Sequence, residues 1–513
     1  MSILGSLIQK GARLRALAGQ QVRATPAEHQ QKQLTNLLRK ARDCAFGRQH
    51  RFSSILFSAD PALAFREQVP ATDYHSMYEQ WWQQGHLCDT PDVCWPGTTP
   101  YYALSSGTSQ AASKYIPVTE DMLRYMRRGS RRMLFDMAHY GLTPRNFTKH
   151  MLMVGSCTSP KREGLHHTGD LSGIIGLNRP RWMEHFYRPG RHITDLPDWD
   201  DRIARIADEA PQWDVGFAVA NPMWLQLIIE RIISQYHLNN IHELWPNFSV
   251  YVHGGVFFDP YRASFEHLLG KPVHYVNSYL ASEGFFAYQQ RPGDADMRLL
   301  TDAGIYFEWV PFNNKNFDDN GDLRTTEPET HMLEEAVPGQ TYAMLISTCS
   351  GAWRYLLGDT VVITDPYRGM MRINGRTKQF LSVCGEHLSI DNLNAAVQEA
   401  DVQLNAGIRE FTVGGVREGT YWAHQWYLSM DNPNVKAADF ARVVDEALCR
   451  LNDDYAVERK YVLRNIHAEV LPNATFMGWL ENRGKFNGQA KIPRVMKNTQ
   501  LEDFQAYLKS RNK

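Results

Sequence analysis

The chain has 513 residues, of which 43% are apolar and 22% are charged, and its formal net charge is −1. This composition is ordinary for a soluble protein of more than one domain, and the balanced charge argues against a nucleic-acid binder or a polybasic membrane protein. The sequence contains no run of 18 apolar residues, so no membrane span is predicted, and the N-terminus lacks a secretory pattern. We expect a cytoplasmic location. We also expect a monomer or weak dimer. The seven cysteines contain no C-x-x-C pair, which fits buried thiols better than disulfides or a cysteine zinc site.

The first predicted helix opens with the capping box Thr25-Pro26-Ala27-Glu28, which places proline in the first turn. Apolar residues then recur at helical spacing as far as Ala45, and Gly47 is predicted to close the segment. A second helix is predicted over residues 120–137. Its arginines fit a solvated face better than an anion-binding cluster.

A hydroxyl-rich segment, Ser105–Lys114, follows a predicted strand at Tyr101–Leu104 and precedes another at Tyr115-Ile116. Its hydroxyls, backbone N–H groups and terminal lysine could hold phosphates, although a solvated turn explains it equally well. The spacing of a Walker loop is absent.

From about residue 150, short apolar strands alternate with helical segments, which predicts an α/β domain with mixed sheets. A helix is predicted over Pro222–Tyr236. The polar segment 316–327 has calcium-loop spacing, but we favour a hairpin turn because a strand precedes it. The predicted strands are Met151–Val154, Val250–Val252, Val273–Val276, Ile305–Val310, Met344–Ser347 and Val361–Thr364.

The character of the chain changes after Ile373, where Gly375-Arg376-Thr377-Lys378 makes a polar break. We expect residues 1–377 to form an N-terminal domain and residues 378–513 a smaller α+β domain. The elements predicted for the smaller domain are helices near Asp391–Glu399 and over Lys436–Asn452, and strands at Glu410–Val413 and Tyr421–Leu428.

Four further motifs carry groups that could bind a nucleotide. They are Tyr279-Leu280-Ala281-Ser282-Glu283, with an aromatic ring beside oxygen ligands; His253-Gly254-Gly255; the stretch Trp353–Asp359, whose carboxylate could accept ribose hydroxyls; and the lysines Lys378 and Lys491. Ordinary structure explains each motif, taken alone, at least as well.

The order of these motifs resembles the adenylate-forming superfamily, and in detail the Gretchen-Hagen-type acyl acid amido synthetases. Four stretches carry the resemblance: Ser105–Lys114, Tyr306–Pro311, Trp353–Asp359 and Gly488–Arg494. The segment Gly385–Ser389 looks more similar to bacterial members than to the hormone-conjugating plant members.

The resemblance implies a large N-terminal adenylate-forming α/β domain, with mixed β-sheets and flanking helices, and a smaller α+β C-terminal domain on a hinge. It implies ATP and Mg²⁺ as cofactors and Lys491, Lys114 and Glu283 as catalytic residues. The implied roles are phosphate binding by Ser105, Ser106, Thr108, Ser109 and Lys114; adenine binding by Gly254, Gly255 and Tyr279; magnesium and α-phosphate binding by Ser282 and Glu283; ribose binding by Asp359; cofactor binding by Arg376 and Lys378, with Lys378 at the hinge; and stabilisation of the adenylation transition state by Lys491.

The acyl-acid pocket should be apolar, and its candidate residues, which taken singly fit an ordinary core better, are Tyr125, Met126, Met223 and Trp224. We therefore expect an ATP-dependent ligase that adenylates a small hydrophobic carboxylic acid and transfers the acyl group to an amine such as an amino acid. The alternatives are transfer to a thiol, from coenzyme A or a carrier protein, and a non-catalytic binding protein.

Overall fold

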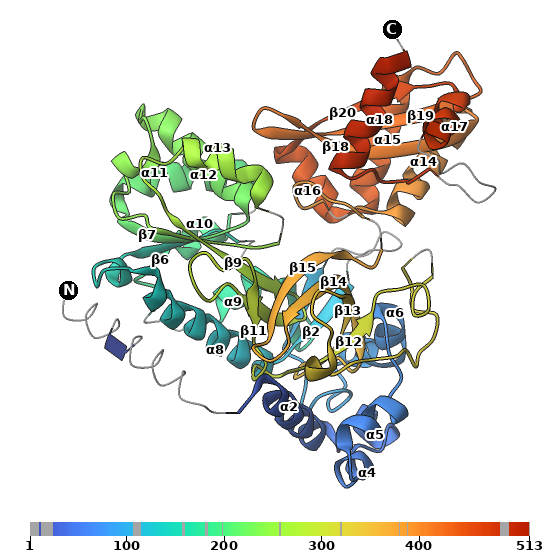
Figure 1. Cartoon of the computed structure of the whole chain (residues 1–513). Coiled ribbons are helices and arrows are strands. Elements are labelled where there is room, and N and C mark those ends of the chain that lie inside the picture. The colour runs from blue at the N-terminus through green and yellow to red at the C-terminus, as the bar shows by residue number, and fades with distance from the viewer. Residues whose placement is uncertain are drawn as a thin grey trace. The chain divides into compact units, whose positions relative to one another are not determined.

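The computed structural model describes residues 10–11, 24–105, 114–155, 160–179, 183–196, 198–255, 258–318, 321–378, 380–386, 388–482 and 492–511. The chain divides into two compact units (Figure 1). The larger unit contains the residues up to Ser105 and Tyr115–Thr377, and the smaller unit continues from Lys378.

A mixed sheet forms the centre of the larger unit. Among the described residues it has 11 strands in the order β12-β13-β14-β15-β11-β10-β9-β8-β7-β3-β6. Strands β3 and β6 to β9 pair in parallel, and β9 to β15 pair antiparallel, so the sheet is mixed as predicted. The strands are β3 (His150–Met153), β6 (Tyr187–Arg188), β7 (Val215–Val219), β8 (Val250–His253), β9 (His274–Ala281), β10 (Gly284–Tyr288), β11 (Met297–Leu299), β12 (Ile305–Pro311), β13 (Thr341–Thr348), β14 (Tyr355–Asp365) and β15 (Met370–Arg376).

Helices cover both faces of the parallel half of this sheet: α8 lies on one side and α11, α12 and α13 lie on the other (Figure 1). The helices of this unit are α2 (Pro26–Ala41), α3 (Ala45–Gln49), α4 (Phe52–Leu56), α5 (Pro61–Gln68), α6 (Tyr74–Met77), α7 (Gln83–Cys88), α8 (Glu120–Asp136), α9 (Leu171–Leu177), α10 (Arg191–Thr194), α11 (Trp199–Glu209), α12 (Pro222–Tyr236) and α13 (Asp259–His267). No helix of the described residues is both long enough and apolar enough to cross a membrane.

A second sheet of the larger unit has the order β2-β1-β5-β4. Its strands are β1 (Tyr101–Ser105), β2 (Lys114–Val118), β4 (Lys161–Glu163) and β5 (His166–Asp170). Strands β1 and β2 flank the hydroxyl-rich segment, as predicted. Strand β5 pairs with β1 in parallel and with β4 antiparallel.

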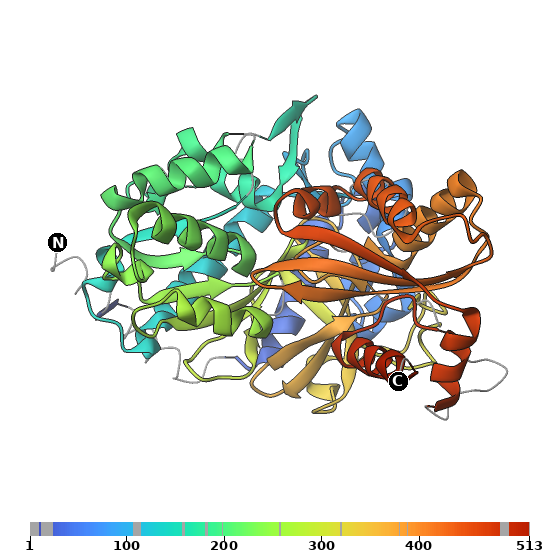
Figure 2. The ribbon, with the colours of Figure 1, turned by 90° about the horizontal axis from the view of Figure 1, so that it is seen from above.

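The smaller unit contains a sheet of order β18-β19-β20 and a short pair, β16 and β17. Figure 2 shows helices on both sides of the larger of these sheets. Helices α15 and α16 contact β20, and α17 and α18 contact β18. Its elements are β16 (Phe380–Leu381), β17 (Leu388–Ser389), α14 (Ile390–Leu404), β18 (Ile408–Glu418), β19 (Tyr421–Met430), α15 (Ala437–Leu451), α16 (Asp453–Tyr461), β20 (Leu463–Val470), α17 (Asn473–Asn482) and α18 (Asn498–Arg511). Strand β20 and helices α16, α17 and α18 were not predicted from the sequence, whereas α15 matches the helix predicted over Lys436–Asn452.

Most of the predicted elements are present. Helix α12 has the predicted bounds, α8 ends one residue early, and Thr25 and Glu28 form the expected capping box. An antiparallel bridge between Phe317 and Leu323 confirms the hairpin turn in place of a calcium loop. Arg124, Arg127, Arg128 and Arg131 of α8 are exposed, which supports the solvated-face interpretation, whereas Arg132 is half-buried and pairs with Asp302.

One predicted helix was wrong. The segment predicted to run to Gly47 breaks after Ala41, and Gly47 lies inside the separate helix α3 rather than at a helix end. A Cβ atom on Gly47 would lie 2.1 Å from the Ala41 carbonyl oxygen. Glycine is therefore required for the close packing of α3 against the end of α2, not for termination.

A buried ion pair joins β12 to the start of β14. The Arg354 guanidinium donates to both carboxylate oxygens of Glu308, at 3.1 and 3.0 Å, and each side chain is only 1% exposed. Arg354 also donates to the carbonyl groups of Arg66 and Val69, at 2.8 and 2.7 Å. These contacts hold α5 and both strands together, and they account for a fully buried arginine.

We predict that Arg354→Met lowers the free energy of unfolding by about 3–5 kcal/mol, because it leaves the Glu308 carboxylate buried without its cation. Native-state hydrogen exchange of β12 and β14 peptides measures the change. The control is Arg372→Met, which removes a half-exposed ion pair with Asp296 and should cost less than about 1 kcal/mol. Equal losses in the two variants would contradict the role of the buried pair.

Two buried carboxyl groups in the smaller unit, Glu386 and Glu458, have pKa values that are shifted in opposite directions. Burial alone would raise the pKa of Glu386, but His424 and the backbone N–H groups around Cys384 lower this pKa to about 2. Burial, with the Glu386 charge nearby, raises the pKa of Glu458 well above its ordinary value of 4.5. Among the described residues, none offers a hydrogen-bond partner to Glu458 Oε2.

Because the folded state raises the pKa of Glu458, it binds that proton more tightly than the unfolded chain does. Stability should therefore fall as the pH rises above 4.5, by up to about 1.4 kcal/mol per pH unit until the folded pKa is reached. We predict that Glu458→Gln removes this loss. The difference in melting temperature between the variant and the wild type should therefore shift in favour of the variant when the pH is raised from 5 to 8. Glu446→Gln, at an exposed position on α15, serves as the control; a parallel pH profile for wild type and Glu458→Gln would refute the prediction.

Candidate functional site

Three of the predicted nucleotide-binding residues meet in the larger unit: Tyr279 on β9, Asp359 on β14 and Arg376 at the end of β15. The Tyr279 hydroxyl donates to Asp359 Oδ2 at 2.5 Å, and Arg376 Nε lies 3.0 Å from Asp359 Oδ1. Tyr279 is 5% exposed and Asp359 8%, whereas the Arg376 side chain is 37% exposed. The carboxylate is thus fixed from the buried side and neutralised from the solvent side.

The sheet has to curve for this contact to form. Strands β9 and β14 are not neighbours, because β15, β11 and β10 lie between them in the hydrogen-bonding order. Asp359 and Arg376 are direct partners in the β14–β15 register, so their contact follows from strand pairing. The Tyr279 contact follows only from the curvature, which brings a side chain of β9 across to β14.

Tyr279 acts in this cluster as a hydrogen-bond donor. Burial and the neighbouring Asp359 charge raise the pKa of Tyr279 well above its ordinary value, so the hydroxyl keeps its proton. Its ring packs against Phe286, with ring centroids 4.9 Å apart. The hydroxyl is therefore bonded to Asp359 and the ring is packed against Phe286, so Tyr279 does not present an open ring face.

Glu283 makes a second contact between the same parts of the sheet. Ser282 and Glu283 form the turn from β9 to β10, and the Tyr355 hydroxyl of β14 donates to Glu283 Oε1 at 3.4 Å. Glu283 is 8% exposed. Burial, followed by the Glu283 charge, raises the pKa of Tyr355 well above its ordinary value. Burial raises the pKa of Tyr279, and Asp359 and Glu283 both lie close enough to it for their charges to raise this pKa further.

Two glycines follow β8, and each is required at its position for a different reason. A Cβ atom on Gly254 would lie 2.4 Å from the Ser278 carbonyl oxygen of β9, so no other residue allows this approach. Gly255 has a φ angle of +84°, in the region that glycine favours. The backbone therefore stays uncovered at the end of β8, beside β9.

The other predicted phosphate ligands surround a segment that the structure does not describe. Ser105 ends β1 and Lys114 begins β2, and both are half-buried. Ser106, Thr108, Ser109 and Lys491 lie outside the described residues. Lys378 is the first residue of the smaller unit and is half-buried.

The predicted acyl-pocket residues occupy two different places. Met126 is buried and Tyr125 partly buried in the main hydrophobic core, on helix α8. Trp224 on α12 stacks on Trp199 of α11, with ring centroids 4.0 Å apart. The side chain of Met223 lies outside the described part of the structure.

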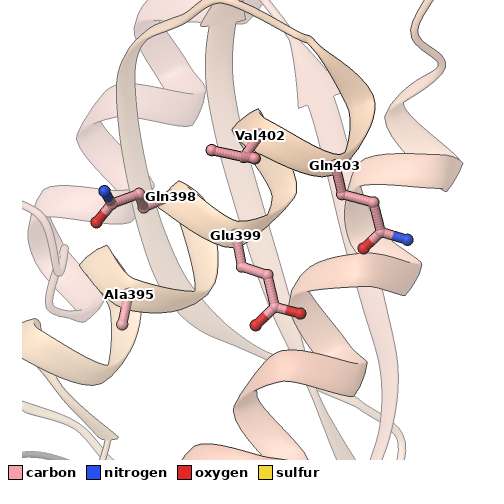
Figure 3. A pocket seen from close by; sticks show the side chains of 5 residues that line it. All are labelled: Ala395, Gln398, Glu399, Val402 and Gln403. Carbon is pink, nitrogen blue, oxygen red and sulfur yellow. The ribbon is translucent and has the colours of Figure 1, made fainter.

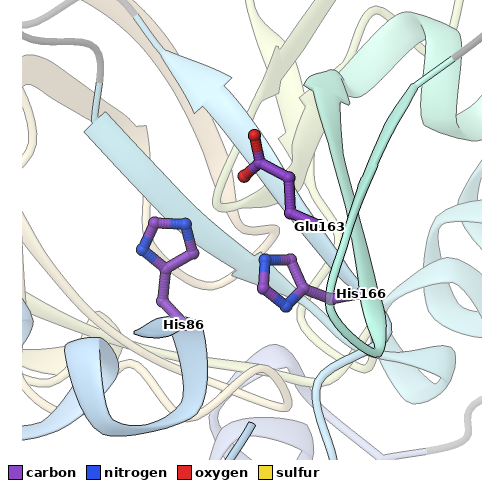
Figure 4. A group of neighbouring side chains, drawn as sticks. All are labelled: His86, Glu163 and His166. Atoms are coloured by element: carbon purple, nitrogen blue, oxygen red, sulfur yellow. The ribbon is translucent and has the colours of Figure 1, made fainter. Parts of the chain in front are cut away.

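Two features were not anticipated from the sequence. A shallow hollow on α14 is lined by Ala395, Gln398, Glu399, Val402 and Gln403 and contains none of the predicted ligands (Figure 3). A cluster of potential metal ligands forms from His86, Glu163 and His166 (Figure 4). The short spacing of Glu163 and His166 across a hairpin was the available signal for this cluster, but nothing local indicated His86.

Family models match most of the chain. The model described as the GH3 family N-terminal domain matches residues 19–202 and 158–273. The GH3 family central domain matches residues 298–374, and the GH3 family C-terminal domain matches residues 391–500.

Relatives of established activity share about a quarter of their aligned residues with this chain. The jasmonoyl–L-amino acid synthetase GH3.5 of Oryza sativa subsp. japonica is 26% identical over 284 residues, covering 50% of this chain and 47% of that protein. The indole-3-acetic acid-amido synthetase GH3.3 of Arabidopsis thaliana is 24% identical over 369 residues, covering 67% and 58%. The matches thus span about half the length of these relatives.

Solved structures establish the fold. The GH3.15 acyl acid amido synthetase has a TM-score of 0.56 at 16% identity and covers 93% of both chains. A 2-hydroxyisobutyryl-CoA ligase, in complex with 2-HIB-AMP and CoA, has a TM-score of 0.59 at 14% identity and covers 94% of this chain and 92% of that one. These similarities confirm the predicted mixed α/β fold with a smaller C-terminal domain. Together with the three domain models, they confirm the resemblance found in the sequence: this chain belongs to the GH3 family.

Proposed function

We propose that this protein is an ATP-dependent acyl acid amido synthetase. In the first half-reaction, a carboxylate oxygen of a small hydrophobic acid bonds to the α-phosphorus of ATP, and pyrophosphate leaves. In the second, an amine, such as that of an amino acid, attacks the acyl carbon, and AMP leaves with its electron pair. The observation that carries the proposal is the Asp359 carboxylate, which Tyr279 and Arg376 hold in place, in a chain of the GH3 family.

In this proposal Asp359 accepts the ribose hydroxyls of ATP. A carboxylate suits this task when its orientation is fixed and one edge stays accessible. Tyr279 and Arg376 provide that fixing, since each bonds a different carboxylate oxygen. We assign Tyr279 to positioning Asp359, and Gly254 and Gly255 to the close approach of backbone to the adenine.

Glu283 fits the requirements of Mg²⁺, which prefers hard oxygen donors and usually keeps some of its waters. Its carboxylate lies in a turn, next to the Tyr355 hydroxyl, and Ser282 offers a second oxygen. A bound Mg²⁺ would neutralise charge on the phosphates. Glu283 would hold the ion, and the buried Tyr355 hydroxyl would keep the Glu283 carboxylate oriented.

We assign the remaining phosphate contacts to Ser105, Ser106, Thr108, Ser109 and Lys114, around the hydroxyl-rich segment. Residues 1–377 and 378–513 would act as two domains joined at Lys378. In the adenylating arrangement Lys491 would stabilise the negative charge that develops on the transferring phosphoryl group, and movement about Lys378 would remove it for the second step.

The acid pocket is assigned to the apolar residues Tyr125, Met126, Met223 and Trp224. The named relatives conjugate indole-3-acetic acid or make jasmonoyl-amino acids, which supports a hydrophobic acid and an amino acid as the two substrates. We propose a cytoplasmic location and a monomer or weak dimer.

Pyrophosphate exchange tests the proposal. The purified protein is incubated with ATP, Mg²⁺ and single aryl, indole or fatty acids, and acid-dependent exchange is expected for at least one acid class. That acid is then offered with amino acids or with coenzyme A, and mass spectrometry identifies the product. An amide supports the amido synthetase, a thioester replaces it with a thiol-transferring ligase, and no exchange with any acid rejects adenylation.

We predict that Tyr279→Phe raises the KM for ATP about 5- to 15-fold, which corresponds to the loss of one hydrogen bond of about 1–1.5 kcal/mol, and leaves the KM for the acid unchanged. The matched control is Tyr288→Phe, which removes another buried 2.5 Å bond from tyrosine to aspartate, with Asp136. Equal effects of both variants on the KM for ATP would show that Tyr279 is merely structural.

We predict that Lys491→Ala slows pyrophosphate exchange by about 30- to 1,000-fold, the usual effect of removing one preorganised charge-stabilising donor. Amide formation from a chemically prepared acyl-adenylate should be spared, because no phosphoryl group transfers in that step. Equal loss of both half-reactions would contradict this role for Lys491.

We predict that Glu283→Gln raises the Mg²⁺ concentration needed for half-maximal exchange, because an amide is a weaker ligand than a carboxylate. The magnesium titration is compared with that of Glu446→Gln, which alters an exposed carboxyl group on α15. An unchanged midpoint in Glu283→Gln would remove this residue from the metal site.

A further inference from the structure

A group of three potential metal ligands lies apart from the residues assigned to ATP. His86 comes from α7, Glu163 ends β4 and His166 begins β5, where the two strands pair with Glu163 opposite His166. One ligand atom from each residue lies within 4.8 Å of the others. Figure 4 shows a ring nitrogen of each histidine facing the space beneath the Glu163 carboxylate. The hairpin and the helix therefore present their donors to one point.

His166 already has the surroundings of a metal ligand. Its Nδ1 lies 3.1 Å from Asp89 Oδ1, and Asp89 also accepts the backbone N–H of Leu165. The residue is 3% exposed, yet none of the described residues provides a hydrogen-bond partner for its Nε2. A carboxylate on one ring nitrogen commonly orients the other nitrogen toward a metal. Without a ligand, the buried Nε2 costs about 1–3 kcal/mol.

His86 is held just as firmly. Its Nδ1 lies 2.7 Å from the Tyr78 hydroxyl, which leaves Nε2 for another partner. Its ring lies against Tyr115 and Tyr102, at centroid distances of 4.1 and 4.8 Å.

Glu163 supplies the adjustable ligand. One carboxylate oxygen accepts from the Thr168 hydroxyl at 3.1 Å, and the other lies 2.8 Å from the Lys161 ammonium group. The Lys161 side chain is 79% exposed, so a bound cation can replace it at little cost. The three ligand atoms lie within 4.8 Å of one another, and zinc bonds of about 2.0–2.2 Å place ligands roughly 3.4 Å apart, so the ligand atoms have to approach one another by at most about 1.4 Å.

We propose that His86, Glu163 and His166 bind one divalent transition-metal ion, with Zn²⁺ as the best-suited occupant. Two imidazole nitrogens and one carboxylate oxygen, with a fourth position for water, make a recognised zinc ligand set. Mg²⁺ and Ca²⁺ fit poorly, because they require six or more oxygen ligands. The proposal does not depend on the ligase activity.

The position of the site indicates its consequence. It connects α7 to the hairpin from β4 to β5, and the rings around His86 belong to β1 and β2, the strands on either side of residues 106–113. A bound ion stabilises the folded form by mass action, because the unfolded chain does not hold the three ligands together. We therefore expect zinc to stabilise this four-stranded sheet and to reduce its local opening.

The test uses the untagged full chain after removal of metals with a chelator. Zn²⁺ is titrated in competition with a chromophoric chelator, and the bound metal is measured after gel filtration. We expect one equivalent of zinc, a raised melting temperature, slower hydrogen exchange in α7, β4 and β5, and a visible spectrum typical of tetrahedral Co²⁺ when cobalt replaces zinc.

His166→Gln and Glu163→Gln should each weaken zinc binding at least 100-fold; Glu163→Gln alters a side chain that is one-third exposed and should fold normally. Asp89→Asn should weaken zinc binding by about 10- to 100-fold, because Asp89 orients the His166 ring through its contact with Nδ1. The control is His167→Gln, the adjacent histidine on β5, whose ring lies beside Tyr101. The proposal fails if zinc does not bind stoichiometrically, or if His166→Gln and Glu163→Gln bind it as the wild type and His167→Gln do.

Discussion

The hydrogen bond from Tyr279 to Asp359 closes the large sheet across its own curvature, and the arrangement of the candidate site depends on it. The backbone hydrogen bonds fix each strand to its neighbours, but they leave β9 and β14 separated by three other strands. The buried hydroxyl and the carboxylate join them directly. The contact from Tyr355 of β14 to Glu283, in the turn after β9, makes a second connection between the same two parts of the sheet.

The buried ion pair between Glu308 and Arg354 holds the start of β14 in place. Arg354 lies directly before β14, and its guanidinium contacts β12 and the end of α5 at once. A rigid start of β14 fixes the position of Asp359 further along the strand. The motif Trp353–Asp359 therefore combines two tasks, since its first residues anchor the strand and its last supplies the carboxylate that Tyr279 and Arg376 hold.

Sequence patterns predicted the elements well where the signal was local. The capping box at Thr25, the helix Pro222–Tyr236 and the strands around Ile305 and Val361 follow from periodicity and turn residues alone. The interpretation of Gly47 was wrong because its role is a close contact with Ala41, which no local pattern encodes. For Tyr279, the sequence placed the residue in the site but did not indicate that its hydroxyl is committed to Asp359.

By itself, the sequence determined the family, many of the helices and strands and the identity of most candidate ligands, because these depend on neighbouring residues and on motif order. Only the tertiary structure decided which ligands meet. Tyr279 and Asp359 are 80 residues apart, and His86 and His166 are also 80 apart, so their contacts depend on sheet curvature and strand register. Twist and packing accumulate over many strands, and no short stretch of sequence contains them.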